Sequence, residues 1–124
     1  MIIAGIGCRA NCPATDIIVI LRQAEAQSGL RATAIAIPAF KSEEPGLLTA
    51  AQTLNLPLHE IEDDALAEAQ SRCVTRSERT QAATGHASIA EAAALAAAGP
   101  RATLKLPRIK SSTATCALAE SSPS

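Results

Sequence analysis

The residues best suited to bind an anion follow the first apolar segment of the chain. Ile2–Ile6 is an isoleucine-rich run, and Gly-Cys-Arg follows it at positions 7–9. Gly5 and Gly7 would let the backbone bend sharply and approach a ligand, and the helix expected next would offer free N–H groups to an anion. The pattern predicts an anion-binding turn, although a tight strand-to-helix turn without a ligand would use the same glycines.

This turn lacks two features of a dinucleotide-binding site. Such a site has a third glycine where Ala10 stands, and an acidic residue about 20 residues further on. Pro38 and Ala39 occupy the end of the second expected strand instead. A small nucleotide-binding regulatory domain is therefore kept only as an alternative.

Cys8 could act as a thiolate, because Arg9 and a helix N-terminus favour the ionised thiol. No histidine base lies near it in sequence, so we expect Cys8 to be a packing residue and not a nucleophile. Three residues separate Cys8 from Cys12, and neither His59 nor His86 has a metal-ligand spacing to them. We expect no metal and no cofactor, and we expect the cysteines to stay reduced in the cytosol.

Further charged groups lie in two later segments. Lys41 and Glu44 belong to a polar loop after the second expected strand. Ligands of open α/β sheets bind outside the carboxyl ends of the strands, so this loop should lie beside the first turn. Lys105 and Lys110 fall on an expected terminal hairpin and could complete a basic rim with Arg9. Solvated surface charges would produce the same pattern.

The elements that must position these groups alternate along the chain. Strands are expected at Ile2–Ile6, Thr33–Pro38, Pro57–Ile61, Thr103–Leu106 and Thr113–Ala119, and helices at Asp16–Gln27, Leu47–Leu54, Ala65–Ser71 and Ser88–Ala98. This order predicts an α/β fold: a single three-layer domain with a mostly parallel sheet, helices on both faces and a C-terminal antiparallel hairpin. The domain would span residues 1–119, with a disordered tail at 120–124.

The start of the last helix and the segment before it also bear on the site. Ser88 and Glu91 have the spacing of a capping box, in which a hydroxyl and a carboxylate bond the first backbone N–H groups of a helix. The preceding segment, Arg72–Gly85, is polar and aperiodic, and we interpret it as a loop.

The composition of the chain argues against nucleic acids and membranes as binding partners. A chain of 124 residues with a net charge of −1 and one aromatic residue has neither the basic excess nor the stacking surface of a nucleic-acid-binding protein. Seven of the twelve acidic residues lie between Glu43 and Glu68, so charge is segregated. No apolar run reaches the roughly 20 residues of a membrane span, and no signal-peptide pattern is present, so we expect a cytoplasmic protein without a membrane partner.

Five segments, taken in order, carry a resemblance to a known family. They are Gly5–Arg9, Lys41–Leu48, Ala87–Leu95, Leu104–Pro107 with Lys110, and Thr113–Ala119. Together they resemble the family formed by CobE and the C-terminal domain of CbiG, which acts in cobalamin biosynthesis. This chain departs from the family at Asn11, where glycine is common, and at Pro13, where serine or threonine is common.

The resemblance implies a layered α/β fold and a role in building the corrin ring. It implies a polycarboxylated precorrin or corrinoid intermediate as ligand, with other cobalamin biosynthesis enzymes as further possible partners. CbiG proteins open the lactone of cobalt-precorrin-5A and release acetaldehyde. A lactone hydrolase or carbon-extruding enzyme is therefore an alternative, with catalytic residues unassigned.

Such a ligand needs cations, N–H donors and an apolar floor, which alanine and isoleucine side chains could form. The expected ligand-binding residues are Gly5, Gly7, Cys8, Arg9, Lys41, Glu44, Ser88, Glu91, Lys105 and Lys110.

Overall fold

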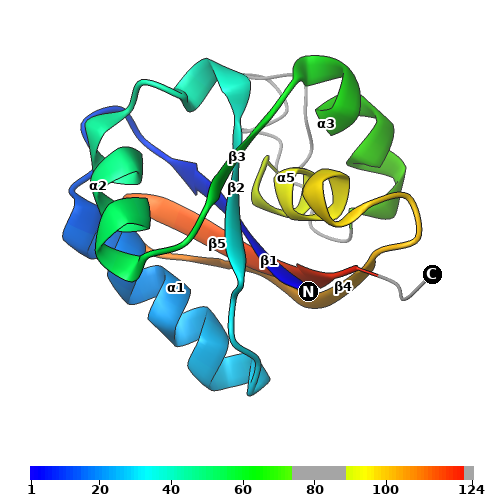
Figure 1. Ribbon diagram of the computed structural model, residues 1–124, viewed down its shortest axis with the longest axis horizontal. Coiled ribbons are helices and arrows are strands. Elements are labelled where there is room, and N and C mark those ends of the chain that lie inside the picture. Colours follow the sequence, from blue (N-terminus) through cyan, green and yellow to red (C-terminus); the bar gives the residue numbers. More distant parts are fainter. Residues whose placement is uncertain (74–88, 122–124) are drawn as a thin grey trace.

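A mixed five-stranded sheet runs through the centre of the protein (Figure 1). Its strands are β1 (Ile2–Cys8), β2 (Ala34–Pro38), β3 (Leu58–Ile61), β4 (Thr103–Lys110) and β5 (Ala114–Glu120), in the spatial order β3-β2-β1-β5-β4. β1 pairs in parallel with β2, and β2 with β3, whereas β5 is antiparallel to both β1 and β4. Four of the five strands therefore run in one direction, which confirms the predicted mostly parallel sheet with a terminal hairpin.

Helices cover both faces of the sheet, as predicted. One face carries α1 (Ala14–Ser28) and α2 (Pro45–Leu54), the other carries α3 (Asp63–Ala69) and α5 (Ile89–Ala98), and two short 3-10 turns, η1 (Ala39–Lys41) and η2 (Gln70–Arg72), follow β2 and α3 (Figure 1). The computed structural model describes residues 1–73 and 89–121. Ser88 and nearly all of the expected Arg72–Gly85 loop lie outside the described residues.

Several elements are longer than the sequence predicts. α2 begins at Pro45 and α3 at Asp63, because proline and acidic residues both suit the first turn of a helix. β4 continues through Pro107, where a register shift between Leu106 and Ile109 marks a bulge. A proline fits there because an edge strand need not use every N–H group.

The C-terminal boundary also needs a correction. Glu120 is opposite Ile2 of β1 and Thr103 of β4, so it belongs to the sheet and not to the predicted tail. The N–H of Ser121 donates to the Met1 carbonyl at 3.0 Å. Residues 122–124 lie outside the described residues. Among the helices that the structure describes, none has the length and apolar character to cross a bilayer.

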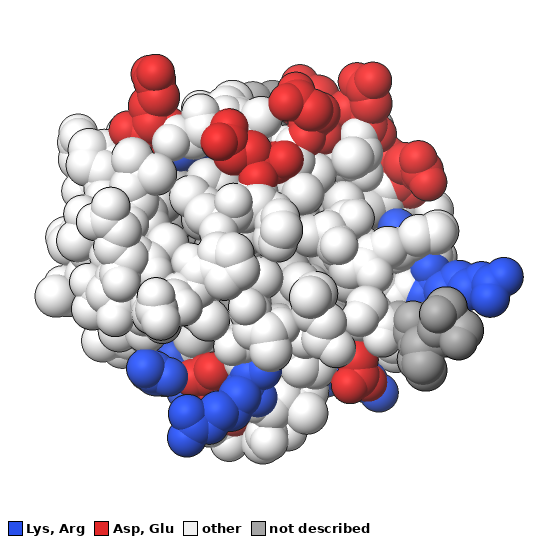
Figure 2. Space-filling model, viewed as in Figure 1, with Lys and Arg blue, Asp and Glu red and all other residues white. Residues whose placement is uncertain are grey.

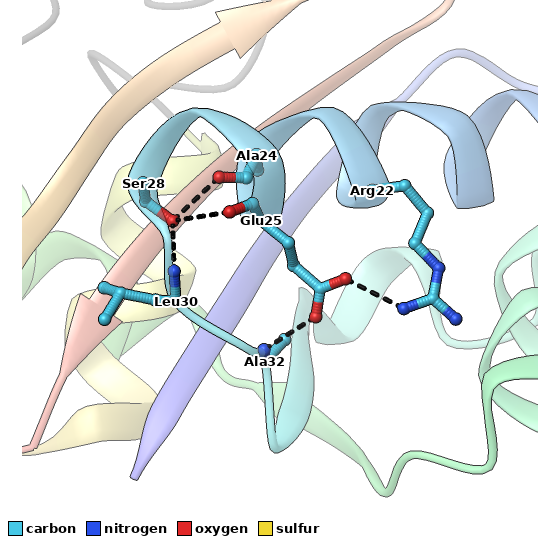
Figure 3. A network of polar contacts seen from close by, with 6 residues as sticks. All are labelled: Arg22, Ala24, Glu25, Ser28, Leu30 and Ala32. Carbon is cyan, nitrogen blue, oxygen red and sulfur yellow. Dashed lines mark hydrogen bonds and ion pairs between the residues drawn. The ribbon is translucent and has the colours of Figure 1, made fainter.

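The end of α1 is fixed by local polar contacts (Figure 3). Ser28 Oγ donates to the Ala24 carbonyl at 2.8 Å and accepts the Leu30 N–H at 3.1 Å. The Glu25 carboxylate accepts the N–H of Ala32 at 2.9 Å, across the connection to β2. The connection is therefore held by its own side chains, which sets where β2 begins beside β1.

β1 is the central strand, and its side chains alternate between the two cores. Ile2, Ala4 and Ile6 pack with α1 and α2, whereas Ile3 packs with α3 and α5. Gly5 belongs to the α5 side, where a Cβ atom would collide with the carbonyl oxygen of Ala90 and lie 2.9 Å from the Ala94 Cβ. The absence of a side chain at Gly5 therefore lets the backbone of α5 approach the sheet closely.

We predict that Gly5→Ala lowers the free energy of unfolding by about 3 kcal/mol or more, the upper end of overpacking costs. The new methyl group meets helix backbone, which cannot rotate away. Gly7→Ala is the matched control, because its Cβ would meet the rotatable Thr115 hydroxyl, at 2.7 Å, and we expect a loss of about 1 kcal/mol. Urea unfolding measures both. Equal losses would contradict the close approach at Gly5.

Candidate functional site

Segments that lie far apart in sequence meet at the carboxyl edge of β1. The N–H of Arg9 donates to the Thr113 carbonyl at 3.0 Å, which joins the end of β1 to the turn between β4 and β5. Lys110, the last residue of β4, pairs with Thr115, which also pairs with Gly7 of β1. Arg9 and Lys110 are both exposed, so this edge presents two cations to solvent.

Glu44 ties the loop after β2 to the same edge. One carboxylate oxygen, Oε1, accepts the N–H of Asn11 at 2.6 Å, and the other, Oε2, lies 4.0 Å from Lys41 Nζ. A Cβ at Gly46 would collide with the Cys12 carbonyl oxygen, so the start of α2 and the β1–α1 turn are in direct contact. The structure thus brings Lys41 to the edge that holds Arg9, as the sequence predicts.

Asn11, which the sequence interpretation did not select, determines the shape of the first turn. Its φ is 64°, in the left-handed region, and the Cys12 N–H donates to the Arg9 carbonyl at 3.2 Å across the turn. Asparagine is among the few residues other than glycine that adopt this conformation readily. One signal in the sequence could have indicated this role, because Asn11 stands where the resembling family commonly has glycine.

The predicted roles of Gly5 and Gly7 in this turn are wrong. Both residues lie within β1, and the turn begins only after Cys8. A Cβ at Gly7 would face Thr115 and Ile89, so this glycine, like Gly5, is directed at neighbouring elements. Their conformational freedom is therefore not used to approach a ligand.

The first turn of α1 already has a carboxylate. Asp16 lies there, where its charge complements the positive end of the helix dipole, and its Oδ2 accepts the Thr113 hydroxyl at 2.8 Å. The expected anion site made of free helix N–H groups is therefore partly compensated from within the protein. Cationic side chains are left as the main attraction for an anionic ligand.

The pKa of Cys8 is raised from 9.0 to about 11, mainly by burial and to a smaller extent by the neighbouring Cys12, whereas Lys41 acts in the opposite direction. At neutral pH the thiol is therefore protonated, which agrees with the expectation that Cys8 is not a nucleophile. Among the described residues, no group of three His, Cys, Asp or Glu side chains could hold a metal ion.

Two of the expected site residues lie away from the open edge. Lys105 is at the opposite end of β4, with its Nζ 3.5 Å from Glu120 Oε1, and Glu120 pairs with the first residue of β1. Glu91 is fully buried in α5, and its Oε2 accepts the N–H of Arg108 at 2.9 Å, within the bulge of β4. Lys105 therefore cannot join Arg9 in a rim, and Glu91 holds the edge strand.

The sequence interpretation did not select Phe40 as a site residue, although it is the single aromatic residue of the chain. It lies in η1, between Ala39 and Lys41, and 55% of its surface is exposed. The expected floor of alanine and isoleucine is wrong for most such residues of the sheet, because helices bury them on both faces. Phe40 is thus an accessible apolar surface next to a cation of the site.

The charge around the carboxyl edge is divided. Figure 2 shows acidic side chains along one edge of the molecule, above β3 and the start of α3, where the parallel strands end, and basic side chains along the opposite edge, beside the end of α1 and the N-terminus. The exposed acidic residues between β2 and the end of α3 are Glu43, Glu60, Glu62, Asp63, Asp64 and Glu68. The carboxyl edge of the sheet therefore has acidic residues on its β2 and β3 side, and the cations Arg9 and Lys110 lie on its β1 and β4 side.

A shallow depression of about 530 Å³ lies elsewhere, between α2 and the start of β3. It is lined by Leu48, Ala51, Gln52, Asn55, Leu56, Pro57 and Leu58. None of these side chains is charged, so the depression does not suit a polyanion.

Comparisons with known proteins all point to the same family. A family model described as the cobalamin synthesis G C-terminus matches residues 2–119. The protein CobE of a Sinorhizobium species is 35% identical over 121 residues, which is 95% of this chain and 79% of that protein.

Two solved structures are similar over almost the whole chain, both at 35% identity. A crystal structure of CobE, described as a protein from the cobalamin biosynthetic pathway, gives a TM-score of 0.90 over 96% of this chain and 89% of that one. The cobalamin biosynthesis protein chiG from Agrobacterium tumefaciens gives a TM-score of 0.81 over 99% of this chain and 100% of that one.

We predict that iodoacetamide labels Cys8 slowly at neutral pH. The rate should rise about tenfold per pH unit up to about pH 11, because only the thiolate reacts and burial holds the pKa at that value. Mass spectrometry of the native protein measures the rate, and Cys8→Ser assigns it, since the three other cysteines are buried. Rapid labelling at neutral pH would make Cys8 an activated thiol.

Proposed function

The chain belongs to the cobalamin synthesis G C-terminus family and is a cobalamin biosynthesis protein, and we propose that it binds a polycarboxylated corrinoid intermediate at the carboxyl edge of β1. One observation supports this proposal most strongly. Arg9, Lys41 and Lys110 come from three separate segments of the chain and gather at one edge. Cations gathered in this way suit a ligand with several carboxylates.

The arrangement can distinguish a carboxylate from its amide. Hydrogen bonds between a lysine or arginine and a carboxylate are about twice as strong as neutral ones, and an amide forms only the neutral kind. The exposed acidic residues beside β3 add repulsion on one side. Attraction and repulsion together would orient a polyacid over the β1, β5 and β4 side of the edge.

The macrocycle of a corrinoid is a broad ring with apolar faces, and Phe40 supplies a matching surface. Its ring is more than half exposed and is adjacent in sequence to Lys41. Contact with the ligand would remove this apolar surface from water while Lys41 met a peripheral carboxylate.

The two alternative functions have less support. Gly5 and Gly7 face α5 and β5 instead of an open phosphate-binding loop, which weakens the nucleotide alternative. A lactone hydrolase of the same pathway would release a two-carbon product, so an assay for acetaldehyde separates it from a binding protein. A cytoplasmic location and contacts with other cobalamin biosynthesis enzymes stay predictions.

We predict that Lys41→Ala weakens the binding of cobyrinic acid, a corrinoid with free carboxylates, by about tenfold to a hundredfold. A hydrogen bond to a charged group contributes about 1.5–3 kcal/mol, and about 1.4 kcal/mol corresponds to a factor of ten. Added salt should also weaken binding by the natural protein, because it screens exposed charges. Titration of the visible absorbance of the corrinoid measures both effects.

Lys105→Ala is the matched control for this experiment. Like Lys41, Lys105 lies near a carboxylate, at 3.5 Å against 4.0 Å, but at the opposite end of β4 from Lys110. We expect Lys105→Ala to bind cobyrinic acid as tightly as the natural protein does. We also expect cobinamide, whose side chains are amidated, to bind more weakly than cobyrinic acid. Equal affinity for both corrinoids, with no effect of salt, would exclude the cationic edge as the binding site.

We predict that Phe40→Ala weakens the binding of cobyrinic acid about tenfold without changing how the affinity depends on salt. Burial of a phenylalanine side chain contributes about 1.5–3 kcal/mol, and part of that would be lost. Val19→Ala is the control, because Val19 is equally exposed, at 55%, but lies on the outer surface of α1. The proposed contact is refuted if the two variants bind alike.

A further inference from the structure

The two edge strands of the sheet differ in how open they are to a further strand. β4, at one edge, contains Pro107 and two register shifts against β5, and it carries the basic residues Lys105, Arg108 and Lys110. Proline, bulges and basic side chains are features by which edge strands avoid pairing with another chain. β3, at the other edge, contains no proline, lysine or arginine and keeps a regular register with β2. β3 is therefore the edge to which a strand can be added.

The backbone groups of β3 that face outward follow from its pairing with β2. The Ile35 N–H donates to the Pro57 carbonyl at 2.9 Å, so this carbonyl points toward β2. Because these directions alternate along a strand, Leu58 and Glu60 direct their N–H and C=O groups away from β2. Within the part of the chain that the structure describes, no strand lies on this side of β3. The outward groups can therefore bond a strand of another molecule.

An uncharged surface with exposed apolar side chains lies beside this edge. No residue of α2 is charged, and Leu48 of this helix is 41% exposed. The shallow depression between α2 and the start of β3 is lined in part by Leu48, Leu56 and Leu58. A strand of four residues offers few hydrogen bonds, so apolar contact at this surface would supply much of the stability of an association.

The charges at the two ends of this surface have opposite signs (Figure 2). Glu60 and Glu62 are exposed at the carboxyl end of β3. Arg31 is exposed in the connection that leads to the amino end of β2, and Arg22 is tied to that connection through Glu25 (Figure 3). A second copy of the chain in antiparallel orientation would place its arginines on the side of these acids, and two-fold symmetry would repeat the match.

We propose that β3 pairs antiparallel with β3 of a second copy, so that the two sheets become one continuous sheet in a two-fold symmetric dimer. The outward groups determine the register: Leu58 of each copy bonds Glu60 of the other, and His59 lies opposite His59 of the second copy. A shift by two residues would put Glu60 opposite its own copy, where like charges repel. Nothing in the proposed function requires a second copy, so the two can fail separately.

The first test measures the mass of the full chain by sedimentation over a range of concentrations. We expect twice the chain mass of 12.7 kDa at the higher concentrations. Glu60→Pro should abolish the dimer, because it removes an outward N–H and leaves the bonds to β2 in place. Glu60→Ala is the matched control, since it keeps the N–H and should stay dimeric, and thermal melts establish that both variants are folded.

Three results of this measurement would overturn the proposal. They are natural protein with the mass of one chain at every concentration, a mass that keeps rising beyond two chains, and a folded Glu60→Pro variant that stays dimeric.

The second test, which does not depend on the proline variant, is disulfide cross-linking. Opposed residues of a non-hydrogen-bonded antiparallel pair have Cα atoms about 4.5 Å apart, within the span of a disulfide. Mild oxidation of His59→Cys should therefore give a dimer on non-reducing electrophoresis. Glu62→Cys is the control, because six residues along the strand direction would separate its two copies, about 20 Å. Equal cross-linking of the two variants, or none in either, would overturn the proposed pairing.

The third test concerns the match of charges. Arg31→Glu should raise the dissociation constant of the dimer about tenfold, because symmetry makes the substitution act twice and reversal turns attraction into repulsion. Arg101→Glu is the control, because Arg101 is also exposed but precedes β4, at the far edge of the sheet. Equal dissociation constants for the two variants would overturn the antiparallel arrangement.

Discussion

The close approach of α5 to β1 at Gly5 is the constraint on which much of the structure depends. A helix can lie this near a strand only where the strand has no side chain, and α5 contributes mainly alanine to the contact. The position of α5 in turn sets the reach of Glu91, whose carboxylate accepts the Arg108 N–H in the bulge of β4. The end of β4, and with it Lys110, is therefore held by the same packing that fills the core.

The carboxyl edge of β1 shows how separate segments are joined without a large polar core. The Glu44 carboxylate bonds the turn after β1 and lies near Lys41, while Arg9 bonds the β4–β5 turn through its backbone. Their cationic side chains are left accessible, and acidic residues gather on the β3 side. The charge at this edge is therefore uneven, and the proposed binding of an anion rests on this local arrangement and not on the net charge.

Much of the fold could be predicted because its signals are local. The isoleucine-rich strands, Gly29 at the end of α1 and the alanine-rich last helix each follow from a few neighbouring residues. The resemblance to the CobE and CbiG family rested on five short segments in order, and it was confirmed over residues 2–119. The starts of α1, α2 and α3 each lie two residues before the expected position, and proline or acidic residues at or next to these starts suit the first turn of a helix.

The sequence by itself thus determined the order of the elements, the three layers and the family. Only the tertiary structure decided which charges share an edge. Lys105 and Lys110 both belong to β4, a strand of eight residues, yet Lys105 lies near its start and Lys110 at its end, so their surroundings differ. Glu91 and Gly5 were both among the expected ligand-binding residues, but packing across the sheet turned both toward the protein interior. Spacing along a chain specifies local geometry, whereas the neighbours of a side chain depend on long-range packing that no single segment encodes.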